Sequence, residues 1–200
     1  MKRTFDILLA GIGLIVSAPL WPLIAAAIRI DSRGPVFYAQ PRVGERGRTF
    51  MVLKFRSMIA DAERHVGPKQ ADADDPRITR VGRVLRATAM DELPQLWNIF
   101  RGDMSFVGPR ALRPEEIDGD AAGAPVPLRA IPGFDERSTV PPGLTGIAQI
   151  YAPRDVSRRQ KFRFDRLYIR RRSFLLDVRL ILLSFWITMR GTWEAREKKF

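Results

Sequence analysis

Cysteine is absent from the chain, and His65 is its only histidine. The absence of cysteine excludes disulfide bonds and thiolate metal sites. A single histidine in a polar stretch argues against a structural zinc site and against a Ser-His or Cys-His nucleophilic pair. The reactive groups that remain are carboxylates, used with or without a metal ion.

Acidic residues are fewer than basic ones. The 200 residues include 34 Lys and Arg but 22 Asp and Glu, which gives a formal net charge of +12. This length suits one domain, or one domain with an anchor. The positive excess favours anionic partners, and it leaves three classes open: phosphorylated substrates, anionic lipid headgroups and nucleic acid.

Charge is missing altogether from residues 7–28, an apolar run near the N-terminus. At about 1.5 Å of rise per residue, a helix of this length matches about 30 Å of hydrocarbon. Pro19 and Pro22 interrupt it, and Ser17 is placed to satisfy a carbonyl freed by the break. We therefore expect a re-entrant membrane helix bent at Ser17 and Pro19, in preference to a kinked transmembrane helix or a buried soluble helix.

Basic residues flank the apolar run on both sides. Lys2 and Arg3 precede it, and five arginines follow it: Arg29, Arg33, Arg42, Arg46 and Arg48. The positive-inside bias then places both ends in the cytoplasm. We expect two parts, a re-entrant membrane helix at residues 1–31 and a domain on the cytoplasmic face at residues 32–200.

The rest of the chain predicts an α+β fold that is mostly helical, a small domain with one short β-hairpin. The hairpin strands are expected at residues 36–40 and 49–55, around a turn rich in glycine and arginine. Helices are expected at residues 56–63, 78–87, 92–101, 157–172 and 174–189. The last of these is short for a membrane crossing, so we expect an interfacial amphipathic helix or a core helix.

Loops are expected at residues 66–76 and 119–143, which are polar or rich in glycine and proline. Three aspartates in the first loop match no calcium-binding spacing, so a solvated loop is favoured over a metal site there: Asp72, Asp74 and Asp75. Apolar surface on the 174–189 helix is available to the bilayer or to a homodimer.

Two adjacent carboxylates, Asp91 and Glu92, stand at the expected start of a helix. Pro94 is tolerated in a first turn, which places Asp91 at or near the N-cap. A helix N-terminus favours an ionised carboxylate and attracts phosphate. Arg86 and Arg110 could hold phosphate oxygens, and Mg²⁺ between phosphate and carboxylate would neutralise charge. From local spacing alone, a plain N-cap and an ordinary first-turn acid remain the simpler interpretation.

Four sequence motifs follow one another along the chain, at residues 54–58, 77–86, 91–110 and 142–149. The third begins Asp-Glu-Leu-Pro-Gln-Leu-Trp and ends Gly-Pro-Arg, and the fourth reads Pro-Gly-Leu-Thr-Gly-Ile-Ala-Gln. The motifs and their order resemble the bacterial sugar transferase family, the monotopic phosphoglycosyl transferases. The resemblance covers nearly the whole chain, and the length resembles that of the small members.

The resemblance implies transfer of a sugar-1-phosphate from a UDP-sugar to polyprenol phosphate, such as undecaprenol phosphate, with release of UMP. This is the first membrane step of glycan assembly. It also implies Mg²⁺ as cofactor, membrane lipids as partners, and a monotopic place in the bacterial inner membrane with the catalytic domain on its cytoplasmic face. Ser17 and Pro19 match the family's helix break, although one residue separates them here instead of none.

Residue roles also follow from the resemblance. Asp91 matches the nucleophile, which forms a phosphosugar-aspartate intermediate and binds Mg²⁺. Glu92 matches the second carboxylate of the pair. Arg86 and Arg110 match positions near the bound phosphate, and Lys54 matches the basic residue of the family's Lys-Phe motif.

The chain departs from the family pattern at Pro141, where a basic residue usually precedes Pro-Gly-Leu-Thr-Gly. Two alternatives follow: one basic contact near the active site is missing, or Arg137 or Arg154 supplies it. Asp165 stands at a matching acidic position within a basic helix. It either binds ligand or orients an arginine.

A second class of function is a membrane-tethered module that binds anionic lipid or nucleic acid. Basic residues interleaved with aromatic ones at 158–164, and the run at 170–172, would suit phosphate backbones. An interfacial helix that extends its arginines to headgroups explains the same pattern, and we favour it, with no nucleic-acid partner. A structural membrane scaffold would leave the 91–110 block unexplained.

Overall fold

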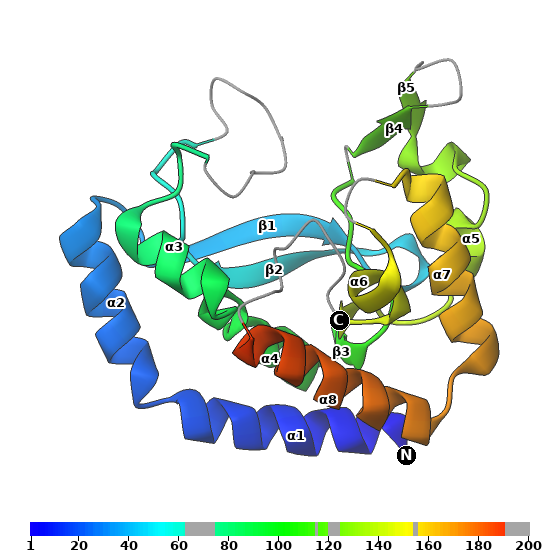
Figure 1. Ribbon diagram of the computed structural model, residues 1–200, viewed down its shortest axis with the longest axis horizontal. Helices are drawn as coiled ribbons and strands as arrows, with labels where there is room; N and C mark the ends of the chain where they lie inside the picture. Colours follow the sequence, from blue (N-terminus) through cyan, green and yellow to red (C-terminus); the bar gives the residue numbers. More distant parts are fainter. Residues whose placement is uncertain (63–74, 115, 120–124, 154–155, 191–200) are drawn as a thin grey trace.

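The computed structural model describes residues 1–62, 75–114, 116–119, 125–153 and 156–190 (Figure 1). Within these ranges the chain is mostly helical and its strands form small two-stranded sheets, so the expected α+β class is confirmed. Figure 1 shows two helices, α1 and α8, along one side of the molecule, with the hairpin of β1 and β2 across its middle.

The N-terminal apolar run forms two helices, α1 (Lys2–Ser17) and α2 (Leu20–Asp31), with a bend of 61° between them. The Ser17 hydroxyl donates to the Leu14 carbonyl at 3.4 Å and accepts from the Trp21 indole N–H at 3.1 Å. The expected break is therefore confirmed. Among the described residues, no unbroken helix has the length and hydrophobicity to cross a membrane, whereas the bent pair meets those two criteria when taken together.

The expected hairpin is present as β1 (Phe37–Val43) and β2 (Thr49–Phe55), joined through the 3-10 turn η1 (Glu45–Gly47). Helix α4 (Gln95–Arg101) packs on β2 through a buried amide. The Asn98 side chain accepts from the Leu53 N–H at 3.0 Å and donates to the Met51 carbonyl at 2.8 Å. These two bonds provide partners for backbone groups of β2 and hold α4 against the hairpin.

The helix expected from residue 56 to residue 63 is wrong over the described residues 56–62, which form an extended segment and a turn. Met58 pairs with Ile78 in an antiparallel bridge. Arg56 is 5% exposed and donates to the Ser32 carbonyl at 2.7 Å and to the Arg33 carbonyl at 2.8 Å. These tertiary bonds outweigh the weak local preference for a helix.

The 119–143 stretch is not a simple loop. Its described part contains β4 (Ile117–Gly119), β5 (Pro125–Pro127), the 3-10 turn η3 (Leu128–Ala130) and the short helix α5 (Phe134–Arg137). Apolar side chains order this stretch because they are buried in one cluster: Leu112, Leu128, Ile131, Phe134 and Phe162. The prediction of a loop from the glycine and proline content was therefore wrong, because this stretch forms a packed segment.

Strands β3 (Ser105–Val107) and β6 (Gly143–Thr145) form a parallel pair that packs against the main core. Helix α6 (Ile147–Tyr151) follows β6 along the chain. Helix α7 (Arg158–Arg171) leads to α8 (Phe174–Met189), which has the bounds expected from the sequence. Helix α8 is apolar on both faces, since Leu180 and Ile187 are buried while Phe185 and Met189 are exposed. The expectation that it is amphipathic is therefore wrong.

Candidate active site

The adjacent carboxylates lie in η2 (Met90–Glu92), a 3-10 turn that follows α3 (Arg80–Ala87). Ala89 precedes the turn in the left-handed conformation, with φ of 54°, which redirects the chain from α3. The expectation that Asp91 caps a helix from residue 92 is wrong, because α4 begins at Gln95 and Pro94 is its N-cap. Proline carries no N–H for the next helical bond, so the turn cannot continue into α4 as one helix.

Lys54 on β2 approaches both carboxylates of this turn. Its ammonium forms an ion pair with Glu92 Oε1 and lies 3.8 Å from Asp91 Oδ2. Burial raises the pKa of Glu92, but the nearby Lys54 and Arg110 charges and hydrogen bonds from Lys54 and Gln95 outweigh it, so the pKa is lowered overall. Glu92 is therefore ionised at neutral pH, and Asp91 is 7% exposed beside it.

Arg110 follows Gly108 and Pro109, and its backbone is fixed by a buried ion pair. Arg137 donates from Nη2 to the Arg110 carbonyl at 2.6 Å and from Nε to Asp165 Oδ2 at 2.9 Å. Asp165 thus orients an arginine, which answers one question left open by the sequence. Arg137 itself is 5% exposed, and its guanidinium already donates to these oxygens. The expectation that Arg137 supplies the contact of the basic residue that the family carries at position 141 is therefore wrong.

The two glycine motifs meet backbone to backbone. A Cβ on Gly143 would lie 2.0 Å from the Gly108 nitrogen, and one on Gly146 would lie 2.4 Å from the Gly108 oxygen. The Gln149 amide also donates to the Gly108 carbonyl at 3.3 Å. The fourth sequence motif therefore supports the Gly-Pro-Arg segment of the third, and side chains larger than glycine cannot enter this contact.

Two further predicted site residues are Arg86 and Arg154. Arg86 lies in the last turn of α3, which packs against η2, and its side chain is partly buried. Arg154 lies outside the described residues. Of the loop aspartates, Asp75 forms an ion pair with Arg77 at 2.6 Å, whereas Asp72 and Asp74 are not among the described residues.

A cluster around the start of α1 was not predicted. Lys2 donates to Asp177 Oδ2 at 2.6 Å and to the Val107 carbonyl at 3.1 Å, while Asp6 accepts from the Phe106 N–H at 3.2 Å. These bonds join α1 and α8 to β3, the strand that leads into the Gly-Pro-Arg segment. The spacing of Lys2 and Asp6 was the available signal, since residues four apart share one helix face.

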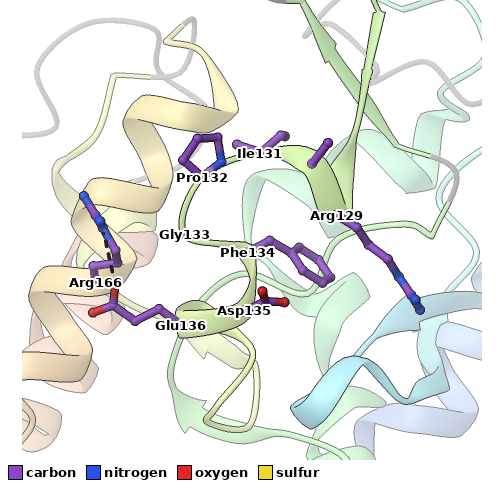
Figure 2. A pocket seen from close by; sticks show the side chains of 9 residues that line it. Arg129, Ile131, Pro132, Gly133, Phe134, Asp135, Glu136 and Arg166 are labelled. Atoms are coloured by element: carbon purple, nitrogen blue, oxygen red, sulfur yellow. Dashed lines mark ion pairs between the residues drawn. The ribbon is translucent and has the colours of Figure 1, made fainter.

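Figure 2 shows a separate pocket of about 320 Å³ between the η3–α5 segment and α7, lined by residues 129–136 and Arg166. Glu136 on its rim pairs with Arg166 at 3.7 Å. None of the predicted site residues lines this pocket. The carboxylate turn with Lys54, rather than this pocket, is therefore the candidate active site.

Comparison with known sequences shows the family of the chain. The sequence profile of the family described as bacterial sugar transferase matches residues 1–191. An undecaprenyl-phosphate glucose phosphotransferase of Komagataeibacter xylinus is 43% identical over 190 residues, which cover 92% of this chain and 35% of that protein. The chain thus spans about a third of that relative's length.

Two further relatives differ in length and in name. The exopolysaccharide production protein ExoY of Sinorhizobium fredii is 37% identical over 90% of this chain and 81% of its own length. A UDP-N-acetylgalactosamine-undecaprenyl-phosphate N-acetylgalactosaminephosphotransferase of Aeromonas hydrophila is 38% identical over 96% of this chain and 44% of that protein. The name of the Komagataeibacter protein specifies glucose and that of the Aeromonas protein N-acetylgalactosamine, whereas the name ExoY specifies no sugar.

Proposed function

The chain belongs to the bacterial sugar transferase family, and we propose that it transfers a sugar-1-phosphate from a UDP-sugar to polyprenol phosphate and releases UMP. The observation that carries the proposal is the Asp91–Glu92 turn held against Lys54 and Arg110, at the positions where the family motifs occur. The names of the relatives support UDP-sugars as donors and undecaprenol phosphate as acceptor.

In the first step an Asp91 carboxylate oxygen attacks the β-phosphorus of the UDP-sugar. A new P–O bond forms to Asp91, the bond from the β-phosphorus to the bridging oxygen breaks, and UMP leaves with that electron pair. Lys54 and Arg110 supply positive charge beside the pentavalent phosphorus, where negative charge develops. Glu92 holds the Lys54 ammonium beside Asp91 through their ion pair.

In the second step a phosphate oxygen of polyprenol phosphate attacks the same phosphorus. The bond to Asp91 breaks, the carboxylate is regenerated, and the product is a polyprenyl-diphosphate-sugar. Two displacements at one phosphorus need one nucleophile on the protein, and Asp91 meets that need with 7% of its surface exposed.

Mg²⁺ fits the residues present. Among the described residues there is no cluster of three or more acidic or histidine side chains, so an ion held by Asp91 and Glu92 would need further oxygens from the substrate. Mg²⁺ in phosphoryl-transfer sites is often held by one or two carboxylates together with substrate phosphates. When bound by Asp91 and the diphosphate, the ion would neutralise phosphate charge that repels the attacking carboxylate.

We further propose that α1 and α2 enter the inner membrane from its cytoplasmic face as a re-entrant helix, with residues 32–200 on that face. Apolar side chains on the bent pair are exposed, including Ile15 at 76%, Leu23 at 67% and Ile30 at 87%. Such surface is costly in water and suits hydrocarbon. Polyprenol phosphate would then reach Asp91 from the bilayer.

The catalytic proposal is tested by UMP release from UDP-glucose and UDP-N-acetylgalactosamine. The protein is held in lipid nanoparticles with undecaprenol phosphate and Mg²⁺. We expect release to require acceptor lipid and metal, and to disappear in Asp91→Asn but not in the control Asp135→Asn, an exposed acid on α5. A phosphosugar adduct should appear by mass spectrometry on a peptide containing Asp91. Undiminished release by Asp91→Asn would overturn the nucleophile assignment.

The membrane proposal is tested by cysteine labelling, since the native chain has no cysteine. Thr4→Cys stands at an exposed position in the first turn of α1, and Arg33→Cys at an exposed position just after α2. We expect an impermeant reagent to label both from the cytoplasmic side. Labelling from opposite sides would mean that the pair crosses the membrane. Adding Pro19→Ala should move the Thr4→Cys site toward the other side, because the straightened helix is long enough to cross.

A further inference from the structure

Four arginines gather beside the carboxylate turn from separate parts of the chain: Arg42 on β1, Arg110 and Arg113 after β3, and Arg158 at the start of α7. Burial, with the repulsion of Arg110 and Arg113, lowers the pKa of Arg42 to about 9. Burial, with the repulsion of Arg110, lowers the pKa of Arg158 to about 10. Contacts place these residues on one segment: Arg42 donates to the carbonyl of Ala111, next to Arg110, and Arg158 pairs with Glu116, which accepts from the Arg113 N–H at 3.1 Å.

Arg42 and Arg158 differ in the oxygens that they contact. Arg42 donates to two uncharged oxygens, the Ala111 carbonyl at 3.1 Å and Gln40 Oε1 at 2.6 Å. Arg158 forms an ion pair with Glu116. Like charges held together in a desolvated place are costly unless an anion joins them. Guanidinium groups are also the side chains best matched to phosphate geometry.

Arg110 joins this cluster to the carboxylate turn. Its charge acts on Glu92 as well as on Arg42 and Arg158, so the cluster adjoins Asp91 and Glu92. A UDP-sugar carries two phosphates that share one oxygen. If Asp91 attacks the outer phosphorus, the inner phosphate must lie immediately beside it, where a group of cations is required.

We propose that Arg42 and Arg158, together with Arg110, form a subsite that binds the phosphate that remains on the nucleotide. This subsite takes the α-phosphate of the donor and then the phosphate of the departing UMP, and the inference rests on the proposed transfer reaction. By stabilising charge on the leaving group, the two arginines act on the first step and not on attack by the lipid.

The same chemistry would suit the phosphate of the lipid acceptor, but the position of Arg158 favours the nucleotide. Figure 1 shows α7 starting at its end remote from α1 and α8 and reaching α8 at its other end. Arg158 is the first residue of α7. The subsite therefore lies toward the end of α7 that is remote from α1, one of the two helices proposed to enter the membrane, and the helix N-terminus adds positive potential there.

Binding of UMP and of uridine to the full-length protein in nanoparticles tests the subsite without turnover. We expect wild type to bind UMP more tightly than uridine. Arg42→Gln and Arg158→Gln should each weaken UMP binding by roughly tenfold or more, the effect of one lost charge-assisted contact, and leave uridine binding unchanged. Arg48→Gln and Arg163→Gln, at exposed positions on the hairpin and α7, should change neither.

A second measurement separates the subsite from the fold and from the lipid phosphate. Arg42→Lys keeps the charge and should retain more UMP affinity than Arg42→Gln. In steady state both Gln variants should raise KM for the UDP-sugar and leave KM for polyprenol phosphate unchanged. Equal losses of UMP and uridine binding, or a rise in the lipid KM with UMP binding intact, would overturn the proposal.

The nucleotide assay is also independent of the transfer reaction. Asp91→Asn should retain the preference for UMP over uridine even though it transfers no sugar. If wild type showed this preference but transferred no sugar from any donor, the proposed function would fail while the phosphate subsite stood. If wild type transferred sugar but bound UMP no better than uridine, the subsite would fail alone.

Discussion

The Lys54–Glu92 pair and the Arg137–Asp165 pair are both acid–base contacts between distant parts of the chain, but they differ in burial. The side chains of the first pair are 24% and 19% exposed, and those of the second 5% and 4%. Burial raises the pKa of Asp165 despite the Arg137 charge, whereas the Lys54 and Arg110 charges lower the pKa of Glu92 despite burial.

Because of this difference in burial, Lys54 and Glu92 can exchange each other for a ligand, whereas Arg137 and Asp165 cannot. A phosphate or metal ion can reach Lys54 and Glu92 without disturbing the core. Arg137 and Asp165 are closed to ligands, and they hold the Arg110 carbonyl in place. The open pair therefore belongs to the chemistry of the site, and the buried pair to its scaffold. Changes to the two pairs should affect different measurements.

The largest expected effect is on stability, from Arg137→Met. It leaves the Asp165 carboxylate buried without its counter-ion, so we expect a loss of about 3–5 kcal/mol in unfolding free energy. Denaturant unfolding of the detergent-solubilised protein measures it, with exposed Arg163→Met as the control. The double change Arg137→Met with Asp165→Leu should regain most of the loss. A single variant as stable as wild type would show that the buried pair is not part of the scaffold.

Lys54→Met should affect the rate instead. Loss of this preorganised charge beside Asp91 should reduce sugar transfer by about a hundredfold, while the unfolding free energy changes by less than about 1 kcal/mol, since the pair is partly exposed. Initial rates and unfolding curves of the same preparation measure both, with exposed Arg48→Met as the control. A loss of stability as large as that of Arg137→Met would remove the distinction between the pairs.

The pH dependence of stability should also depend on the open pair. The folded pKa of Glu92 is lowered from 4.5, so its ion pair stabilises the fold above that value and is lost as pH falls through the folded pKa. Between about pH 6 and about pH 3, wild type should therefore lose more unfolding free energy than Lys54→Met, in which the pKa returns toward its usual range. Parallel curves for the two proteins would contradict this assignment.

The smallest effect is expected at Ala89, whose left-handed backbone precedes the carboxylate turn. Ala89→Gly relieves that conformation but adds freedom to the unfolded chain, so stability should stay within about 1 kcal/mol of wild type, with transfer retained. Ala89→Val should lower both, because a β-branched residue is strongly disfavoured at positive φ. If valine were tolerated as well as glycine, the strained turn would not be what positions Asp91.

Much of the fold followed from local signals. Pro19 and Pro22 within an apolar run predicted the bend between α1 and α2, and a second, almost continuous apolar run predicted the bounds of α8. The predictions of a helix at residues 56–63 and of a loop at residues 119–143 were wrong, because tertiary contacts determine the conformation of these segments. Arg56 is held by carbonyls of the α2–β1 connection, and Phe134 by a core built from α7.

The candidate site divides in the same way. The sequence by itself determined that Asp91 and Glu92 are neighbours at the start of a turn, because adjacency and the missing N–H of Pro94 act within a few residues. Tertiary structure alone decided that Lys54 pairs with Glu92, that Asp165 orients Arg137, and that Arg42 and Arg158 share one place with Arg110. Charge pairing depends on through-space distance, and residues far apart in the chain carry no periodic signal of which partner they will meet.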